Sequence, residues 1–253
     1  ASLVHDFGNP PYGHFGEDII RQWFKKKLPS LLKEKSDVAE EFLASPYVYD
    51  FYRFEGNAQS LRIVSKLHDF KGEFDGLDLT AATLNTILKY TYPSSRKKTE
   101  QITSKKVGYF FAEEETFQKV TEITGSGTNR HPLTFILEAA DDIAYLVADM
   151  EDAIGKGVIS FRDVREFLLE NLSTDAYSAP HSVHTREVLN TIDEEVFSVN
   201  RFFVDLRDKL IDGARHNFVN HYDEIMDGTF NQDLFKNSWA EDLYVILRKL
   251  SEE

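Results

Sequence analysis

Hydrophobic and polar positions follow one another with the three- and four-residue spacing that is typical of amphipathic helices. The first clear stripe begins after Gly13 and consists of Ile19, Ile20, Trp23, Phe24, Leu28 and Leu31. Comparable spacing recurs over residues 61–67, 77–92, 133–154, 161–168, 183–199, 201–220 and 235–250. No run shows the two-residue alternation expected of a half-buried strand. The pattern therefore predicts an all-α protein.

Residues that begin and end helices agree with this pattern. Pro132 precedes the longest stripe, and proline is favoured at a first helical position because the N–H that it lacks has no partner inside the helix. Ser160 and either Asp78 or Thr80 precede two other stripes as predicted N-caps. Pro93 is predicted to end the helix over 77–92. Residues 173–182, which contain Pro180, are predicted to form a polar loop.

Composition narrows the class of protein. The chain has 253 residues, of which 42% are hydrophobic, so a sizeable core is expected. No apolar run reaches about eighteen residues, so no membrane-spanning helix is predicted. Because the sequence has no cysteine, a metal site would use His, Asp and Glu as ligands. The absence of disulfides also agrees with a cytoplasmic location, which is expected.

The charge of the chain places a condition on any anionic ligand. The net charge is −14, which repels polyphosphates and nucleic acids at long range. An anionic substrate therefore needs a local basic pocket. Residues 94–106 are the most basic stretch and are predicted to form an exposed, mobile loop that contains Arg96, Lys97, Lys98, Lys105 and Lys106.

The segment from residue 5 to residue 17 carries the first candidate chemistry. It reads His-Asp-Phe-Gly-Asn-Pro-Pro-Tyr-Gly-His-Phe-Gly-Glu, in which Pro10 and Pro11 predict a stiff, non-helical elbow. His5 and Asp6 offer a nitrogen and an oxygen ligand for a divalent ion. His14 is then a candidate general acid or base, which Glu17 would orient from the same helix face. The alternative is a capped helix end with a surface histidine, but the elbow favours a site.

A second His-Asp pair provides a comparison. His68 and Asp69 stand before a loop without a proline elbow and without a following histidine, so we expect them at the surface.

The stripe over 133–154 carries the second candidate chemistry. Asp141, Tyr145 and Asp149 are spaced by four residues and therefore share one helix face. Aspartate has a poor helix propensity and resists burial, so this group suggests a metal site or a polar pocket. The alternative is an exposed acidic face. The sequence alone does not choose between Asp141 and its neighbour Asp142 as a ligand.

Two further residues have both a structural and a ligand-binding interpretation. Asn57 follows Gly56, and it is predicted either to cap a helix or to present its amide to an oxygen-rich ligand. Lys89 is expected near the end of a helix, where a cation is favoured, or in contact with a phosphate beside Tyr90.

Several of these runs resemble one known family. The run over residues 5–17 resembles the signature of the bacterial deoxyguanosine triphosphate triphosphohydrolases, which lie within the HD-domain phosphohydrolase superfamily. Five further runs are similar to segments of that family, and together the matches cover residue 1 to about residue 235. They are Glu-Gly-Asn-Ala-Gln at 55–59, Lys-Tyr-Thr-Tyr-Pro at 89–93, Lys-Lys-Val-Gly-Tyr-Phe at 105–110, Ala-Asp-Asp-Ile-Ala-Tyr-Leu-Val-Ala-Asp at 140–149 and Gly-Thr-Phe-Asn at 228–231.

The resemblance implies a fold, a reaction and roles for individual residues. It implies an HD-type helical core over residues 1–155 and a helical extension over 156–253. The expected reaction is metal-dependent hydrolysis of a deoxynucleoside triphosphate, most often dGTP, to deoxynucleoside and inorganic triphosphate. The expected cofactor is a divalent ion (Mn, Mg, Ni, Co or Fe) held by His5, Asp6, Asp141 and a histidine upstream of Ala1, so we expect the chain to be a fragment. His14 and Glu17 are the expected catalytic pair. The expected substrate-binding residues are Asn57, Lys89, Tyr90 and Lys106 at the triphosphate, and Tyr145 and Asp149 at the deoxyribose.

The resemblance also implies partners, and other functions stay open. A homo-oligomer such as a hexamer and the binding of single-stranded DNA are expected from relatives. The alternatives are another HD phosphohydrolase, acting on nucleoside monophosphates or signalling nucleotides, and a non-catalytic helical oligomerisation fragment.

Overall fold

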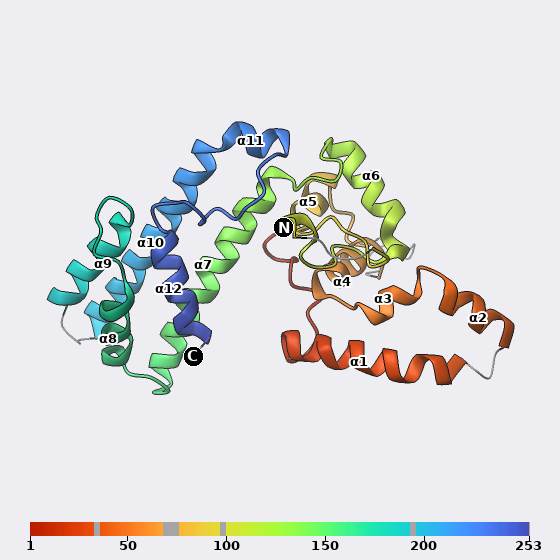
Figure 1. The fold of residues 1–253 in the computed structure, drawn as a ribbon, viewed down its shortest axis with the longest axis horizontal. Coiled ribbons are helices and arrows are strands. Elements are labelled where there is room, and N and C mark those ends of the chain that lie inside the picture. The colour runs from red at the N-terminus through yellow and green to blue at the C-terminus, as the bar shows by residue number, and fades with distance from the viewer. Residues whose placement is uncertain (33–35, 68–75, 97–99, 193–195, 253) are drawn as a thin grey trace. The chain divides into compact units, whose positions relative to one another are not determined.

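The computed structural model describes residues 1–32, 36–67, 76–96, 100–192 and 196–252 (Figure 1). Over these ranges every regular element is a helix, which confirms the predicted all-α class. One isolated parallel bridge pairs Pro93 with Tyr109. His68 and Asp69, the second His-Asp pair, lie outside the described residues, as do Lys97 and Lys98.

The chain forms two compact units, Ala1–Leu137 and Glu138–Glu253. The boundary falls inside the longest helix but one, α7 (Pro132–Gly155), so the helix contributes to both units. Each unit is described by itself below. The division into a catalytic core up to residue 155 and an extension after it stays a prediction.

The first unit is built from short helices around a mixed aliphatic and aromatic core. Helix α1 (Gly13–Leu32) packs on α3 (Val48–Tyr52), and α5 (Ala81–Thr86) packs on α6 (Glu114–Thr124). The remaining helices are α2 (Ser36–Ala44), α4 (Gly56–Arg62), a π-helical turn at Ile63–Leu67 and 3-10 turns at Ile102–Ser104 and Phe111–Glu113. Leu61, Leu88, Tyr109, Phe117 and Val120 form one buried cluster, so the segment after α5 and the segment before α6 meet in the core.

The helix predicted over 77–92 is shorter in the structure, where α5 covers Ala81–Thr86. It begins as expected, because the Thr80 side chain accepts a hydrogen bond from the Thr83 N–H, but it ends at Thr86. The backbone beyond it pairs with a distant segment instead: Thr91 N–H donates to the Thr103 carbonyl at 2.9 Å. Tertiary pairing therefore overrides the local helical pattern here.

The predicted exposed loop over 94–106 is also wrong for several described residues. Ser94, Ile102 and Ser104 are buried, and Ser94 N–H donates to the Tyr109 carbonyl at 3.0 Å. The Asp50 carboxylate, itself buried on α3, explains this placement. It accepts hydrogen bonds from the Ser94 hydroxyl and from the backbone N–H groups of Phe111 and Ala112.

A buried ion-pair network extends from Asp50. Arg62 on α4 lies 3.6 Å from Asp50 and 2.8 Å from Glu113, and its guanidinium stacks 4.3 Å above the Phe110 ring. Lys66 adds a second cation 3.5 Å from Glu113. Each carboxylate thus has a cation and hydrogen-bond donors, which is the condition under which buried charges are tolerated. The network fixes Ser94 and residues 111–113 against α3 and α4.

The second unit is a bundle of longer helices. Its elements after α7 are α8 (Phe161–Asn171), α9 (Pro180–Thr191), α10 (Val196–Asn220), α11 (Tyr222–Asp227) and α12 (Glu241–Glu252). Ser160 caps α8 in a reciprocal capping box with Asp163, as the sequence predicted. The predicted loop at 173–182 is shorter than expected, because Pro180 begins α9 as its first residue.

Helix α12 closes this bundle against α8, α9 and α10. The Asp242 carboxylate accepts from Ser173 N–H at 2.9 Å and from the Ser182 hydroxyl at 2.6 Å, which ties α12 to both ends of the α8–α9 connection. Gly213 on α10 faces Ala240 so closely that an added Cβ would lie 2.4 Å from the Ala240 Cβ. The bundle therefore requires a glycine at this crossing.

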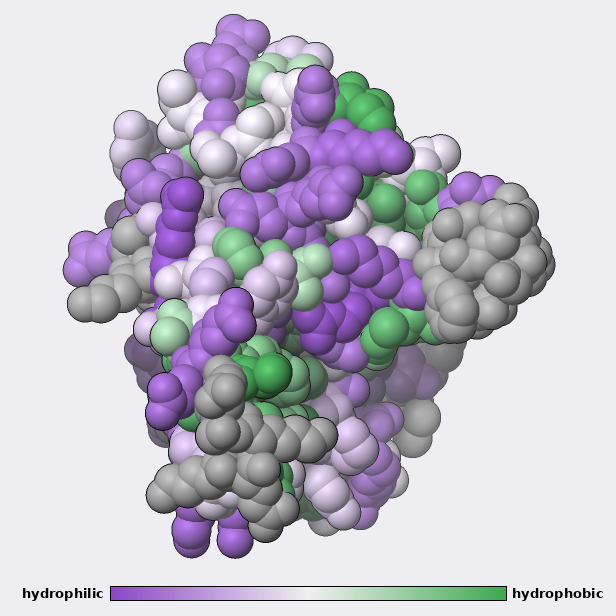
Figure 2. Space-filling model, turned by 90° about the vertical axis from the view of Figure 1, so that its right-hand side faces the viewer, coloured by the Kyte–Doolittle hydropathy of each residue, from purple (hydrophilic) through white to green (hydrophobic). Residues whose placement is uncertain are grey.

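The surface shown in Figure 2 is largely hydrophilic, which agrees with the 28% of charged residues in the sequence. Hydrophilic side chains predominate on the face shown in Figure 2, with smaller hydrophobic areas between them. Among the described helices, none combines the length and the apolar character that crossing a membrane requires.

Replacing Asp50 tests the role of the buried network. Asp50→Ala leaves the Phe111 and Ala112 N–H groups without an acceptor and Arg62 without one of its two carboxylates. We expect a loss of about 3–5 kcal/mol in the free energy of unfolding, measured by urea denaturation. Glu122→Ala, at an exposed position on α6 of the same unit, should stay within about 0.5 kcal/mol of the wild type. A similar small effect of both substitutions would contradict the role given to Asp50.

Candidate functional site

The His-Asp pair at the start of the chain lies in a turn that α4 anchors. The Ser60 hydroxyl, buried on α4, donates to the His5 carbonyl at 2.6 Å and accepts from the Gly8 N–H at 2.9 Å. One side chain thus satisfies a backbone donor and a backbone acceptor on either side of Asp6. Ser60, which lies more than fifty residues later in the sequence, therefore holds the turn that carries both candidate ligands.

The orientation of His5 suits a metal ligand. Its Nδ1 lies 2.8 Å from the Ser2 carbonyl, which can only accept, so a neutral imidazole carries its proton on Nδ1 and its lone pair on Nε2. Nε2 lies 3.5 Å from Asp6 Oδ2. Metal-bound histidines commonly hold their second nitrogen with a backbone carbonyl in this way. The donor set of one nitrogen and one carboxylate oxygen fits a divalent ion such as Mn, Fe, Co or Ni.

The elbow after the pair depends on close backbone approaches. A Cβ on Gly8 would lie 2.1 Å from the Gly56 carbonyl oxygen and 2.2 Å from the Ser60 nitrogen, and a Cβ on Gly16 would lie 2.1 Å from the Pro11 carbonyl oxygen. Tyr12 and Gly13 both have positive φ, at 66° and 53°. The chain therefore turns sharply after Pro11, and only glycine fits where it touches α4.

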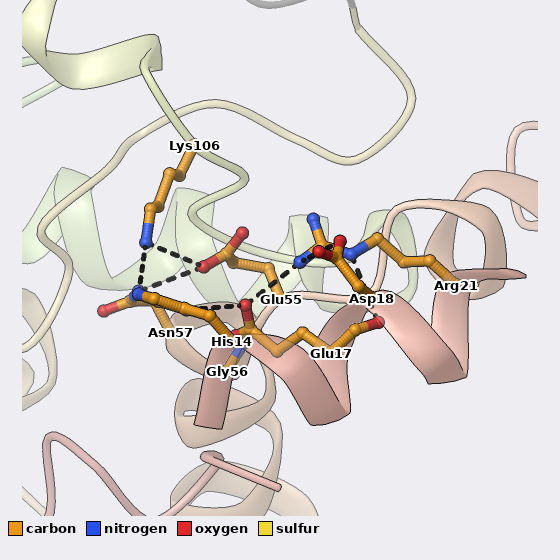
Figure 3. A network of polar contacts seen from close by, with 8 residues as sticks. All are labelled: His14, Glu17, Asp18, Arg21, Glu55, Gly56, Asn57 and Lys106. Carbon is orange, nitrogen blue, oxygen red and sulfur yellow. Dashed lines mark hydrogen bonds and ion pairs between the residues drawn. The ribbon is translucent and has the colours of Figure 1, made fainter. Parts of the chain in front are cut away.

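His14 and Glu17 form the hydrogen bond that the sequence predicted. His14 Nδ1 lies 2.9 Å from Glu17 Oε2, with the imidazole 75% exposed and the Glu17 side chain only 3% exposed (Figure 3). Arg21 Nη2 donates to the same Oε2 at 3.0 Å, and Gly56 N–H donates to Oε1 at 2.7 Å. Because a carboxylate so surrounded by donors accepts only, the neutral His14 carries its proton on Nδ1 and presents a lone pair at Nε2.

Lys106 reaches this group from a segment ninety residues away. Its Nζ lies 3.3 Å from His14 Nε2 and 3.7 Å from Glu55 Oε1, and its side chain is 33% exposed (Figure 3). The Asn57 amide donates to the same Glu55 oxygen at 3.4 Å. Lys106 and Asn57 therefore both contact one buried carboxylate, and His14 contacts Lys106. A lysine and an amide beside a histidine can bind an anionic group and exchange protons with it.

Glu55, a member of this group, has a shifted pKa. Burial raises the pKa of the Glu55 carboxyl above its usual value, the charge of Lys106 opposes this shift, and the nearby Glu17 carboxylate adds to it. Arg21 and the hydrogen bond from Asn57 lower the Glu55 pKa more weakly.

Lys89 and Tyr90 lie beside this group's lysine segment. Gly108, two residues after Lys106, approaches Tyr90 so closely that a Cβ would lie 1.8 Å from the Tyr90 carbonyl oxygen. Buried Arg130 donates to the Lys89 carbonyl at 2.6 Å, and its guanidinium lies 5.6 Å from the centre of the Tyr90 ring. The structure therefore holds the backbone of Tyr90 next to that of Gly108, although Lys89 stands three residues past the end of α5.

The candidate residues of the second unit lie along α7. Tyr145 is 62% exposed, and the negative charge of Asp149 raises the Tyr145 pKa, with burial and a hydrogen bond between the two side chains adding to the effect. Asp141 and Asp142 are both half-buried. The Tyr244 hydroxyl on α12 donates to Asp142 Oδ2 at 2.9 Å, so Asp142 helps to hold α7 and α12 together.

Four residues of the site were not predicted as functional. Arg21, Glu55, Gly56 and Ser60 hold the candidate residues through contacts that span up to fifty-five residues of sequence. Only Arg21 left a local signal, since it stands four residues after Glu17 on the same helix.

The sequence is similar to curated bacterial proteins over nearly its whole length. It is 43% identical over 99% of its residues to a deoxyguanosinetriphosphate triphosphohydrolase-like protein of Listeria monocytogenes, of which it covers 54%. It is 34% identical over 94% to a deoxyguanosinetriphosphate triphosphohydrolase of Yersinia enterocolitica, and 32% identical over 94% to a probable one of Pseudomonas aeruginosa, covering 52% and 51% of them. The chain thus spans about half the length of the curated relatives it matches. No protein-family model matches it.

Replacing Gly8 tests whether the turn that carries His5 and Asp6 depends on contact with α4. In Gly8→Ala the new methyl group would overlap the Gly56 carbonyl and the Ser60 nitrogen, so the turn must shift. We expect a loss of about 1–3 kcal/mol or more in unfolding free energy, measured by chemical denaturation. Gly155→Ala is the matched control, because a Cβ there meets no atom within 4 Å. Equal stability of the two variants would show that the turn does not press against α4.

Proposed function

We propose that the chain belongs to the bacterial deoxyguanosinetriphosphate triphosphohydrolase family, whose curated members it matches over about half of their length, and that it takes part in the metal-dependent hydrolysis of dGTP to deoxyguanosine and inorganic triphosphate. The single observation that supports this most is the cluster of His14, Glu17, Asn57 and Lys106. It combines an oriented histidine base with a cation and an amide at one place. Hydrolysis of a phosphate ester requires both kinds of group.

In this proposal His14 is the general base, and its role follows from its surroundings. Glu17 fixes the imidazole by its Nδ1 proton and favours the positive charge that develops when Nε2 takes a proton from the attacking water. Arg21 and the Gly56 N–H hold the Glu17 carboxylate in place through hydrogen bonds to its two oxygens. The imidazole is exposed, so a bound substrate and a water molecule can reach it.

The proposed metal ligands are His5, Asp6 and Asp141, together with a histidine upstream of the given chain. A divalent ion, when bound there, would polarise the phosphate under attack. The support in the described residues is the orientation of His5 by the Ser2 carbonyl, which leaves the His5 Nε2 lone pair for an ion.

The remaining residues are proposed to bind the nucleotide. Asn57, Lys89, Tyr90 and Lys106 would hold the triphosphate, which a chain with a net charge of −14 needs local cations to attract. Tyr145 and Asp149 would contact the deoxyribose, since a hydroxyl and a carboxylate on one helix face suit hydrogen bonds to a sugar. Assembly as a homo-oligomer such as a hexamer, binding of single-stranded DNA and a cytoplasmic location stay predictions from the resemblance.

The reaction products test the proposal directly. With dGTP and Mn²⁺, the protein should release free triphosphate and deoxyguanosine, separated by anion-exchange chromatography. Orthophosphate or pyrophosphate as the product would instead indicate another HD phosphohydrolase.

Removing the proposed base separates its role from binding. His14→Ala should lower kcat by about 10²–10⁴-fold and change KM much less, because the imidazole acts on the water rather than on the nucleotide. His184→Ala, at an exposed histidine of α9, is the control and should keep wild-type kinetics. Wild-type turnover in His14→Ala would remove the role given to His14.

The two neighbouring aspartates of α7 distinguish a ligand from a structural residue. Asp141→Asn should lower the affinity for Mn²⁺, measured by isothermal titration calorimetry. Asp142→Asn should keep the metal affinity, while the weaker hydrogen bond from Tyr244 lowers unfolding free energy by about 1 kcal/mol. If only Asp142→Asn loses the metal, the assignment of Asp141 is wrong.

A further inference from the structure

Glu55 is a buried carboxylate to which the proposed reaction gives no part. Its side chain is 3% exposed, and it immediately precedes α4, where the Gly56 N–H already serves Glu17. Four groups with charge or hydrogen-bonding capacity act on it: Lys106 from the segment before Gly108, Glu17 and Arg21 from α1, and Asn57 from α4. His14 joins this set through Lys106.

The ionised state of Glu55 depends mainly on Lys106. A buried carboxylate loses the hydration that stabilises its charge, and the neighbouring Glu17 carboxylate makes the charge less favourable still. Lys106 provides the largest opposing effect, at 3.7 Å, whereas the amide of Asn57 contributes a neutral hydrogen bond at 3.4 Å. Arg21 forms ion pairs with Glu17 and Asp18, and it acts on Glu55 more weakly than Lys106 does.

Lys106 is also the group that a polyphosphate would use. Its ammonium group is partly exposed, at the edge of the cluster, and lies 3.3 Å from the exposed imidazole of His14 (Figure 3). A triphosphate bound there would turn the ammonium toward its own oxygens and add several negative charges close to Glu55. Both effects make an ionised Glu55 less favourable.

We propose that Glu55 is the counter-ion of Lys106 in the nucleotide-free protein, and that it takes up one proton from solvent when a polyphosphate binds Lys106. The inference rests on the proposed function only in its use of Lys106 as a phosphate-binding residue. No covalent step is involved: the proton passes from the buffer to a Glu55 oxygen, and the site becomes less negative by one charge as the anion enters. Polyphosphate binding should therefore strengthen as the pH falls through the range in which Glu55 titrates.

The direct test is the number of protons taken up on binding. Inorganic triphosphate is titrated into the wild-type protein and into Glu55→Gln by calorimetry, in buffers of different ionisation enthalpy, over about pH 5.5–8. Glutamine keeps the size of the side chain and an oxygen that accepts from Asn57, but it does not titrate. We expect the wild type to take up more protons than Glu55→Gln, by up to about one per site. Protonation of the triphosphate itself is common to both titrations and cancels in the difference.

Three further measurements make the outcome specific. Asp18→Asn, which changes an exposed carboxylate beside Arg21, should behave as the wild type. Glu55→Gln should bind triphosphate several-fold more tightly than the wild type at the upper end of the pH range, because it lacks the competing charge. Infrared difference spectra of the wild type should show the carbonyl band of a newly protonated carboxyl group on binding, and this measurement needs no variant to fold.

Equal proton uptake by the wild type and a folded Glu55→Gln, or no carboxyl band in the wild type, would overturn the inference. The absence of triphosphate binding would overturn it as well. The proposed function is tested separately, by the products formed from dGTP. Proton-linked triphosphate binding without dGTP hydrolysis would support the inference and contradict the proposed function, and hydrolysis without proton-linked binding would do the reverse.

Discussion

The candidate site depends on one buried carboxylate, Glu17. Its two oxygens receive His14 and Arg21 from its own helix and the Gly56 N–H from the start of α4. These hydrogen bonds have two effects. They fix α1 to the segment that carries Glu55 and Asn57, and they determine which nitrogen of His14 carries the proton. A carboxylate that is 3% exposed costs free energy unless donors surround it, and here each donor is also a part of the site.

Close backbone contacts give the site its shape. Gly8, Gly16 and Gly56 each stand where a Cβ would overlap neighbouring atoms, and Ser60 ties the turn after His5 to α4. The Asp50 network also contributes, because it holds the backbone of Phe111 and Ala112, a few residues after Lys106. Hydrogen bonds, together with glycines that allow the backbones to approach closely, therefore position the segments of the site.

The sequence predicted the local features of this arrangement well and the distant ones poorly. The His14–Glu17 contact follows from a three-residue spacing on a helix, and the caps at Thr80 and Ser160 follow from local hydrogen-bonding rules. The helix over 77–92 was predicted too long, because its last residues pair with Thr103 and Gly108, which no local pattern indicates. Glu55 was not predicted as a site residue for the same reason. Lys106 and Glu17, which act on its charge, lie far from it in the sequence, so only the folded structure brings the three together.

The central claim is that Glu17 sets the protonation pattern of His14. Nitrogen-15 NMR of the histidine side chains, with His14 assigned by its loss in His14→Ala, tests this most directly. The account predicts that neutral His14 carries its proton on Nδ1 in the wild type, and that this preference weakens in Glu17→Gln. A wild-type spectrum in which neutral His14 carries its proton on Nε2 would contradict the account.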